Sequence, residues 1–233
     1  MRPNQSLEPS ADRTWALWGK HMHTFLHSAG SVRQLALLAL LLSFPVTLCR
    51  GEAATQDQST EYDRIVQLIS DEDWKAASDA AATYLAKVGT SGDKGLQARL
   101  RYIIIYATAG AVSTGVFEFD VLDQRLKGFV GKSVILPYRP VVNGACPGGM
   151  NAICISDPDP TSFIVVAANK TSTTIHAFEY VKLRQAMDFA AHTGERGSIT
   201  GTLRKIEPNP NKSRAIVMRI YIDDATVAFS KRS

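Results

Sequence analysis

The sequence predicts an α+β protein: an N-terminal α-helical hairpin followed by a small antiparallel β-barrel. Between residues 61 and 113, apolar side chains recur at three- and four-residue spacing, which places them on one face of a helix. From residue 131 onward, apolar and polar residues alternate between turns rich in Gly, Pro and Asn. The predicted units are a leader over 1–54, helices over 55–115, a linker over 116–130 and the barrel over 131–229.

Residues 1–54 have the features of a leader with an export signal. The apolar run at 35–48 carries no charge and follows Arg33. It is about 14 residues long, whereas a bilayer-spanning helix needs roughly 20. A basic flank, a short apolar core and small residues after it are typical of a secretory signal. The small residues after which cleavage is expected are Gly51, Ala53 and Ala54.

Two alternatives concern this leader. It could stay uncleaved as an N-terminal anchor. Translation could also begin at Met22 instead of Met1, because Met22 opens a leader of ordinary length. In either case the protein is expected to be exported, to a periplasm or to the outside of the cell.

Removing the leader changes the charge argument. The chain has 26 basic and 22 acidic residues, a formal charge of +4. Five of the basic and two of the acidic residues lie in 1–51, which leaves 21 and 20. A basic chain suggests a nucleic-acid or anionic membrane partner, but a nearly neutral one gives no such indication. Nucleic acid is therefore not expected as a partner, and no stable membrane span is expected after cleavage.

Cys146 and Cys154 are the only cysteines beyond the leader. An even pair in an oxidising compartment predicts a disulfide. The alternatives are a redox pair, which usually has two intervening residues, and a zinc site, which needs two further ligands. We expect a disulfide between Cys146 and Cys154.

The helical part divides into three segments, after a polar start at 52–60 that we expect to be flexible. The first segment covers 61–69, and Ser70 is expected to cap the second, which ends before Gly89. The third covers 93–113. Trp74, Ala-rich positions and a Tyr-Leu pair resemble a tetratricopeptide-type hairpin, although only one such unit is visible and solenoids need at least three. The linker at 116–130 is interpreted as a hinge or short helix.

The C-terminal part is predicted to contain six strands and one short helix over 182–192. The strands are expected at 133–138, 150–156, 163–168, 173–181, 197–206 and 214–223.

Three features of this part resemble the OB-fold, a five-stranded, partly open barrel. They are the opening GKSV at 131–134, the helix before the last two strands, and the closing pair GSITGTLRKI and RAIVMRIYID. The resemblance covers about 100 residues and implies a barrel closed by a bend at Gly201. It requires the 150–156 strand to be a disulfide-tied loop. A six-stranded barrel or sandwich of another kind is the alternative.

No catalytic, cofactor-binding or metal-binding motif is present in the sequence. His176 lies in a predicted strand, and His192 ends a predicted helix, where the helix dipole favours it without further function. Asp157 and Asp159 lie in a Pro-rich turn, where aspartate is common, although they could contribute oxygen ligands to a cation.

Two functions remain. The first is a non-enzymatic binding or adaptor module that uses the barrel and the hairpin to bind a protein, peptide or saccharide. The second is an extracytoplasmic hydrolase or metal-dependent enzyme in which residues such as Asp157, Asp159 and His176 converge. The barrel offers aromatic and basic side chains but no interleaved pattern of the two; they are Tyr138, Phe163, Phe178, Tyr180, Arg139, Lys170, Lys182, Arg184, Arg204, Lys205 and Arg219.

Overall fold

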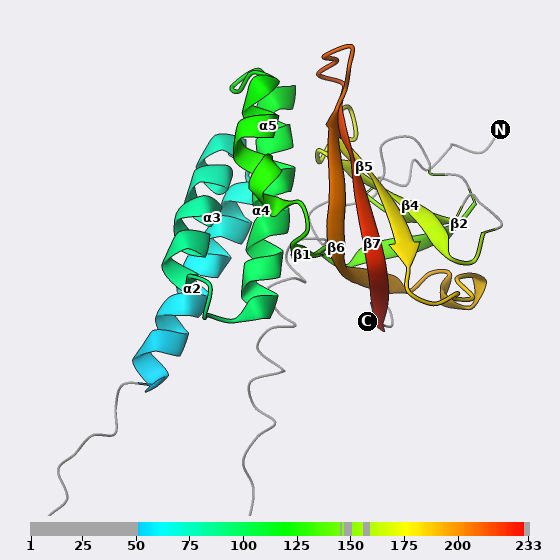
Figure 1. Ribbon diagram of the computed structural model, residues 1–233, viewed down its shortest axis with the longest axis horizontal. Coiled ribbons are helices and arrows are strands. Elements are labelled where there is room, and N and C mark those ends of the chain that lie inside the picture. The colour runs from blue at the N-terminus through cyan, green and yellow to red at the C-terminus, as the bar shows by residue number, and fades with distance from the viewer. Residues whose placement is uncertain (1–50, 145, 147–150, 156–158, 231–233) are drawn as a thin grey trace, which may run out of the picture.

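A computed structural model describes residues 51–144, 146, 151–155 and 159–230, with the side chains of helix α2 described from residue 59. The predicted export signal at 35–48 lies outside these residues. The helices come first in the chain, and the sheet follows (Figure 1). The helices are α2 (Gly51–Ser70), α3 (Trp74–Val88), α4 (Lys94–Ser113) and α5 (Asp120–Leu126), with a 3-10 turn η1 (Lys127–Phe129).

The helix boundaries differ from the prediction at two points. Residues 52–60 belong to α2 instead of forming a flexible start. Ser70 is the last residue of α2, so it does not cap α3. Asp73 does so, because its Oδ1 accepts a hydrogen bond from the Ala76 N–H at 3.3 Å. The sequence offers acids at 71, 72 and 73, and the turn geometry selects the last of them.

Small residues allow α3 and α4 to pack closely. Ala77 and Ala81 of α3 are fully buried. Gly110 of α4 faces the Trp74 ring so closely that an added Cβ would lie 2.5 Å from the Trp74 Cδ2 atom. The expected helical hairpin is therefore present and consists of α3 and α4. Helix α4 has more buried residues than α3.

Within the described residues, seven strands follow the helices, one more than predicted. The additional strand is β2, whose sequence RPVVN begins with an Arg-Pro pair and so lacks an obvious strand pattern. The strands are β1 (Ser133–Ile135), β2 (Arg139–Asn143), β3 (Ile153–Ile155), β4 (Ser162–Ala168), β5 (Ile175–Leu183), β6 (Arg196–Pro208) and β7 (Ile216–Ser230).

The strands form one mixed sheet that closes into a ring. Their order is β1-β6-β2-β3-β4-β5-β7, and β6 also pairs with β7 to complete the closure. The prediction of an antiparallel sheet is wrong at two places, because β2 pairs with β3 and β5 pairs with β7 in parallel. Strand β1 pairs with residues 200–202 of β6, and β2 pairs with residues 196–197 of the same strand.

The helix predicted at 182–192 is absent. Strand β5 continues to Leu183, whose N–H donates to the Thr161 carbonyl at 2.7 Å, and the Arg184 N–H donates to the Ala225 carbonyl at 3.0 Å. These sheet bonds use the donors that a helix would need. Only a 3-10 turn, η2 (Ala190–His192), forms later. The OB-fold order of strands and helix is therefore not reproduced.

The helices and the ring share one continuous hydrophobic core. Helix α4 packs against β1, β5 and β7, so it lies between the other helices and the sheet (Figure 1). Within the described part of the chain, no helix has both the length and the apolar character needed to cross a membrane.

Candidate functional site

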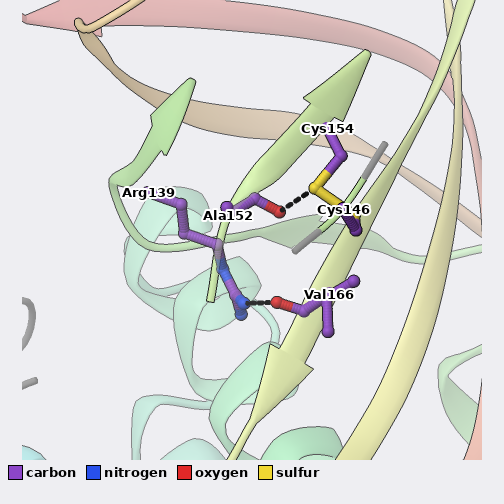
Figure 2. Close-up of a disulfide and its surroundings, with 5 residues drawn as sticks. All are labelled: Arg139, Cys146, Ala152, Cys154 and Val166. Atoms are coloured by element: carbon purple, nitrogen blue, oxygen red, sulfur yellow. Dashed lines mark hydrogen bonds between the residues drawn. A yellow bond between two sulfur atoms is a disulfide. The ribbon is translucent and has the colours of Figure 1, made fainter. Parts of the chain in front are cut away.

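The disulfide predicted between Cys146 and Cys154 is present. The two Cα atoms lie 5.0 Å apart, and the bond joins the residues that follow β2 to the middle of β3 (Figure 2). Strands β2 and β3 are parallel neighbours, and the disulfide ties Cys146 to the second of them. Cys154 is fully buried, so this disulfide has a structural function.

His176 is buried in the core, at the bulge of β5. Ile175 pairs with Ala168 and Ala177 with Ala167, so His176 is the additional residue between them. Its ring packs edge-on against Trp74, at 4.8 Å between centroids, and lies equally close to Tyr106. Neither ring nitrogen has a hydrogen-bond partner within the described residues. Burial lowers the pKa of His176 to about 3, with a smaller effect of Arg139, so the imidazole is neutral at ordinary pH.

His192 lies at the surface of the ring. Its Nδ1 is 2.8 Å from the Glu195 Oε2, and its ring stacks on Phe229 with 3.7 Å between centroids. It ends a 3-10 turn rather than the predicted helix, so its orientation follows from these two contacts.

The residues named for the enzymatic alternative do not come together, as far as the structure describes them. Asp159 lies before β4, near the Ser162–Lys182 pair, whereas His176 lies at the other end of the β4–β5 ladder. Asp157 is outside the described residues. Across the part of the chain that the structure describes, no three His, Cys, Asp or Glu side chains gather as metal ligands would.

A buried polar cluster joins α4 to the ring, and the sequence did not reveal it. Arg139 is 2% exposed and Glu179 is 1% exposed. The Tyr102 hydroxyl donates to Glu179 Oε1 at 2.7 Å and accepts a hydrogen bond from Arg139 Nη2. Arg139 Nη1 donates to the Val166 carbonyl at 2.7 Å (Figure 2) and to Asn151 Oδ1 at 3.1 Å.

The two charged members of this cluster, Arg139 and Glu179, are almost completely shielded from solvent. Burial raises the pKa of Glu179 above its ordinary value, and the Arg139 charge and the Tyr102 hydrogen bond oppose this effect. Glu179 shares a face of β5 with Ala177 and Val181, which belong to the continuous core. The cluster therefore fixes the helices on the ring, and we assign it a structural function.

The opposite face of β5 is half-buried at Phe178 and Tyr180 and exposed at Lys182, and it carries a different set of side chains. The parallel register of β5 and β7 places Tyr180 directly beside Tyr221. Their rings stack with 5.1 Å between centroids and 15° between planes. Ile164 of β4 pairs with Tyr180, and Lys205 of β6 pairs with Tyr221, so a row of side chains crosses the four strands.

Charged groups surround the two tyrosines. The Arg204 guanidinium lies 5.3 Å from the centre of the Tyr221 ring, and its Nε is 3.0 Å from Asp223 Oδ2. The Tyr221 hydroxyl donates to Glu207 Oε2 at 2.7 Å, and this hydrogen bond raises the pKa of Tyr221. One face of Tyr221 is therefore covered by Tyr180, and cations from β6 lie over the ring as well.

The tyrosine pair, together with Arg204 and Asp223, lines a hollow of about 360 Å³ on the outer face of the ring. We call it the outer-face hollow. Its lining is Asp159, Ser162, Phe163, Ile164, Tyr180, Val181, Lys182, Arg204, Tyr221 and Asp223. Its volume is at the lower end of the range for small-molecule sites.

The structure thus brings together part of the predicted aromatic and basic set. Tyr180, Lys182 and Arg204 line the hollow, whereas Arg139 is buried on the other side of the sheet. Aromatic and basic residues do interleave, but across strands, by a register that the linear sequence does not reveal. Tyr221 and Asp223, which sequence reasoning missed as site residues, join the hollow for the same reason.

A second hollow of about 370 Å³ lies on the helices. It is lined by Asp79, Ala82, Thr83, Ile104, Arg125 and Phe129. Arg125 and Asp79 form an ion pair at 2.7 Å, and Arg125 also contacts the Phe117 ring. It holds one charge pair and a single aromatic ring, so it has fewer groups to offer a polar ligand than the outer-face hollow.

Comparison of this chain with protein families, with curated proteins and with solved structures found no match. The α+β class, with helices followed by a ring-shaped mixed sheet, therefore rests on the structure alone.

Proposed function

We propose that this protein is an exported, non-enzymatic binding module and that it binds a saccharide in the outer-face hollow. The observation that carries this proposal is the composition of the hollow. One tyrosine face, two carboxylates and two cations surround a single open space on rigid strands.

The chemistry of the hollow matches that of a sugar. A sugar hydroxyl both donates and accepts hydrogen bonds, so it is best met by acceptors and donors together. Asp159 and Asp223 supply acceptors, and Arg204 and Lys182 supply donors. One face of Tyr180 is covered by Tyr221, and the ring lines the hollow, where it can pack against the C–H face of a sugar ring.

Three of these four charged groups, Asp159, Arg204 and Asp223, are already held in place. Asp159 Oδ1 accepts from the Thr161 N–H at 2.8 Å and from its hydroxyl at 2.6 Å, and Oδ2 accepts from the Ser162 hydroxyl at 2.9 Å. Arg204 is fixed by Asp223. A preorganised site loses little conformational entropy when it binds, which favours binding of a small polar ligand.

A saccharide fits this face better than the protein or peptide partners also expected from the sequence. A peptide that adds a strand needs a free sheet edge, but β4, β5 and β7 are each paired on both sides. A stable protein interface buries about 800 Å² on each partner around an apolar centre. Among the described residues, the large apolar side chains that are exposed do not line the hollow; they are Val116, Val130 and Ile216.

Two further observations support this reading. OB domains bind ligands along an outer strand face, and the hollow lies on such a face. We therefore propose that the OB resemblance extends to the position of the ligand. The Cys146–Cys154 disulfide favours an oxidising compartment, in agreement with the proposed export.

The experiment is a binding screen of the purified protein on immobilised oligosaccharides, repeated with two variants of one residue. Tyr180→Ala removes the ring face and is expected to weaken binding about tenfold, the equivalent of about 1.4 kcal/mol. Tyr180→Phe keeps the ring and is expected to bind within about twofold of the native protein. Equal binding by Tyr180→Ala and the native protein would show that the hollow is not the site.

A further inference from the structure

We infer that the saccharide bound in the outer-face hollow is acidic and carries carboxylates along its chain, as polyuronates do. This inference rests on the proposed function and specifies its ligand class. It follows from which charges on the outer face are already paired and which are not.

The carboxylates of this face are already engaged. Asp223 pairs with Arg204, and Glu207 pairs with Lys205. Asp159 accepts three hydrogen bonds from Thr161 and Ser162, and these lower its pKa. None of the three therefore requires a cation from a ligand.

Two cations of the same face are not engaged in this way. Lys182 and Arg219 are exposed, and neither makes an ion pair with any residue in the described ranges. Asp159 attracts Lys182 and Glu207 attracts Arg219, but only through space. The face therefore has four cations and three carboxylates, and its surplus positive charge resides on the two unpaired groups.

The two cations lie at opposite ends of the tyrosine pair. Lys182 follows Tyr180 by two residues on β5, and Arg219 precedes Tyr221 by two residues on β7. Residues two apart point to the same face, and each step rises about 3.3 Å, so the cations are about 13 Å apart along the strands. An acidic oligosaccharide that runs along the β5–β7 seam would pack on Tyr180 in its middle and place carboxylates near both cations.

The distribution of charges and aromatic rings on this face argues against a nucleic acid as the ligand. A single strand carries one phosphate for every nucleotide, and its binding grooves are strongly basic and leave aromatic faces open. Here three carboxylates lie among four cations, and Tyr180 and Tyr221 each have one face covered by the other. An oligosaccharide with widely spaced carboxylates fits this face, because Lys182 and Arg219 can each form an ion pair with one of these carboxylates.

The test is titration calorimetry of the purified protein at low salt, with tetragalacturonic acid and its fully methyl-esterified form as the two probes. The two probes share a ring scaffold and differ in charge. Exposed ion pairs contribute about 0.2–1 kcal/mol each, so the acid is expected to bind about fivefold more tightly than the ester. The difference should shrink as salt is raised.

Two variants assign the preference to residues. In Lys182→Gln combined with Arg219→Gln, the acid and the ester are expected to bind equally, at the affinity of the ester. Lys127→Gln, an exposed lysine in η1 on the helical side, is the matched control and should keep the preference.

The outcomes separate the two proposals. Equal binding of acid and ester by the native protein overturns the acidic ligand and leaves the saccharide site intact. Absence of binding by both probes overturns the acidic ligand, and the oligosaccharide screen with Tyr180→Ala then decides separately on the proposed function. Tighter binding of a thymidine oligonucleotide than of the acid overturns both in favour of a nucleic-acid surface.

Discussion

The Arg139→Met substitution tests how the helices are held on the ring. Met has a comparable length and no charge, so the change removes the polar contacts of Arg139 while largely keeping its volume. Three hydrogen bonds are lost, to Tyr102, to the Val166 carbonyl and to Asn151, and Glu179 remains buried without its cation. Breaking a buried charge pair on one side costs about 3–5 kcal/mol, and we expect this loss in the free energy of unfolding.

The pH dependence of this loss has a defined sign. Burial raises the pKa of Glu179 above its ordinary value of 4.5, so ionisation of Glu179 costs stability as the pH rises through that raised pKa. Without Arg139 the pKa of Glu179 rises further, because the opposing charge is gone. The difference between the native protein and Arg139→Met should therefore be smaller at pH 5 than at pH 8.

Urea unfolding of four proteins measures both effects: the native chain, Arg139→Met, Glu179→Gln and the double variant. Because the two side chains share one hydrogen-bond network, the double variant should lose less than the sum of the single losses, by about 1–3 kcal/mol. A loss below about 1 kcal/mol for Arg139→Met, or strict additivity, would refute the assignment of this cluster as the link between α4 and the ring.

Three further predictions concern the same core. Gly110→Ala should destabilise by at least about 1–3 kcal/mol in urea unfolding, since its Cβ would clash with the Trp74 ring. Burial lowers the pKa of His176 to about 3, so below pH 6.5 the unfolded chain takes up a proton before the folded chain does, and the free energy of unfolding decreases as the pH falls. His176→Phe should reduce this decrease in stability at acid pH. Replacing Cys146 and Cys154 by Ser should cost about 2–3 kcal/mol in the same assay, as expected for so short a loop.

Each of these predictions has a matched control or a contrary outcome. Gly128→Ala adds a methyl group into open space and should change stability little, so equal losses at Gly110 and Gly128 would contradict the packing argument. A decrease in stability at acid pH that survives His176→Phe would place the titrating group elsewhere. Native protein in which the two thiols react freely without reductant would contradict the disulfide.

The succession of helices and strands could be predicted from the sequence because it depends on local periodicity. The spacing of Tyr62, Ile65 and Ile69 places α2, and the alternation of Ile216, Met218 and Ile220 places β7. The parallel pairing of β5 with β7 could not be predicted, because register between distant strands leaves no local pattern. The helix expected at 182–192 does not form for a related reason, because the backbone N–H groups of Leu183 and Arg184 donate to residues of distant segments.

The candidate site was predictable only in its parts. Tyr180, Lys182 and Arg204 were visible as aromatic and basic residues of the sheet, but their proximity depends on the cross-strand register. Arg139 was assigned to the same basic set, although it is buried against Tyr102. A buried arginine has no sequence pattern of its own, because its partners lie far away in the chain.

The most direct test of the account is an amide chemical-shift titration of the native protein with tetragalacturonic acid, followed by two-dimensional NMR. The account predicts that the largest shift changes fall on Tyr180, Lys182 and Tyr221 and on their neighbours in β4 to β7. Changes that gather around Ile104 and Phe129 in the helical hollow, or no changes at all, would contradict binding of an acidic saccharide on the outer face of the ring.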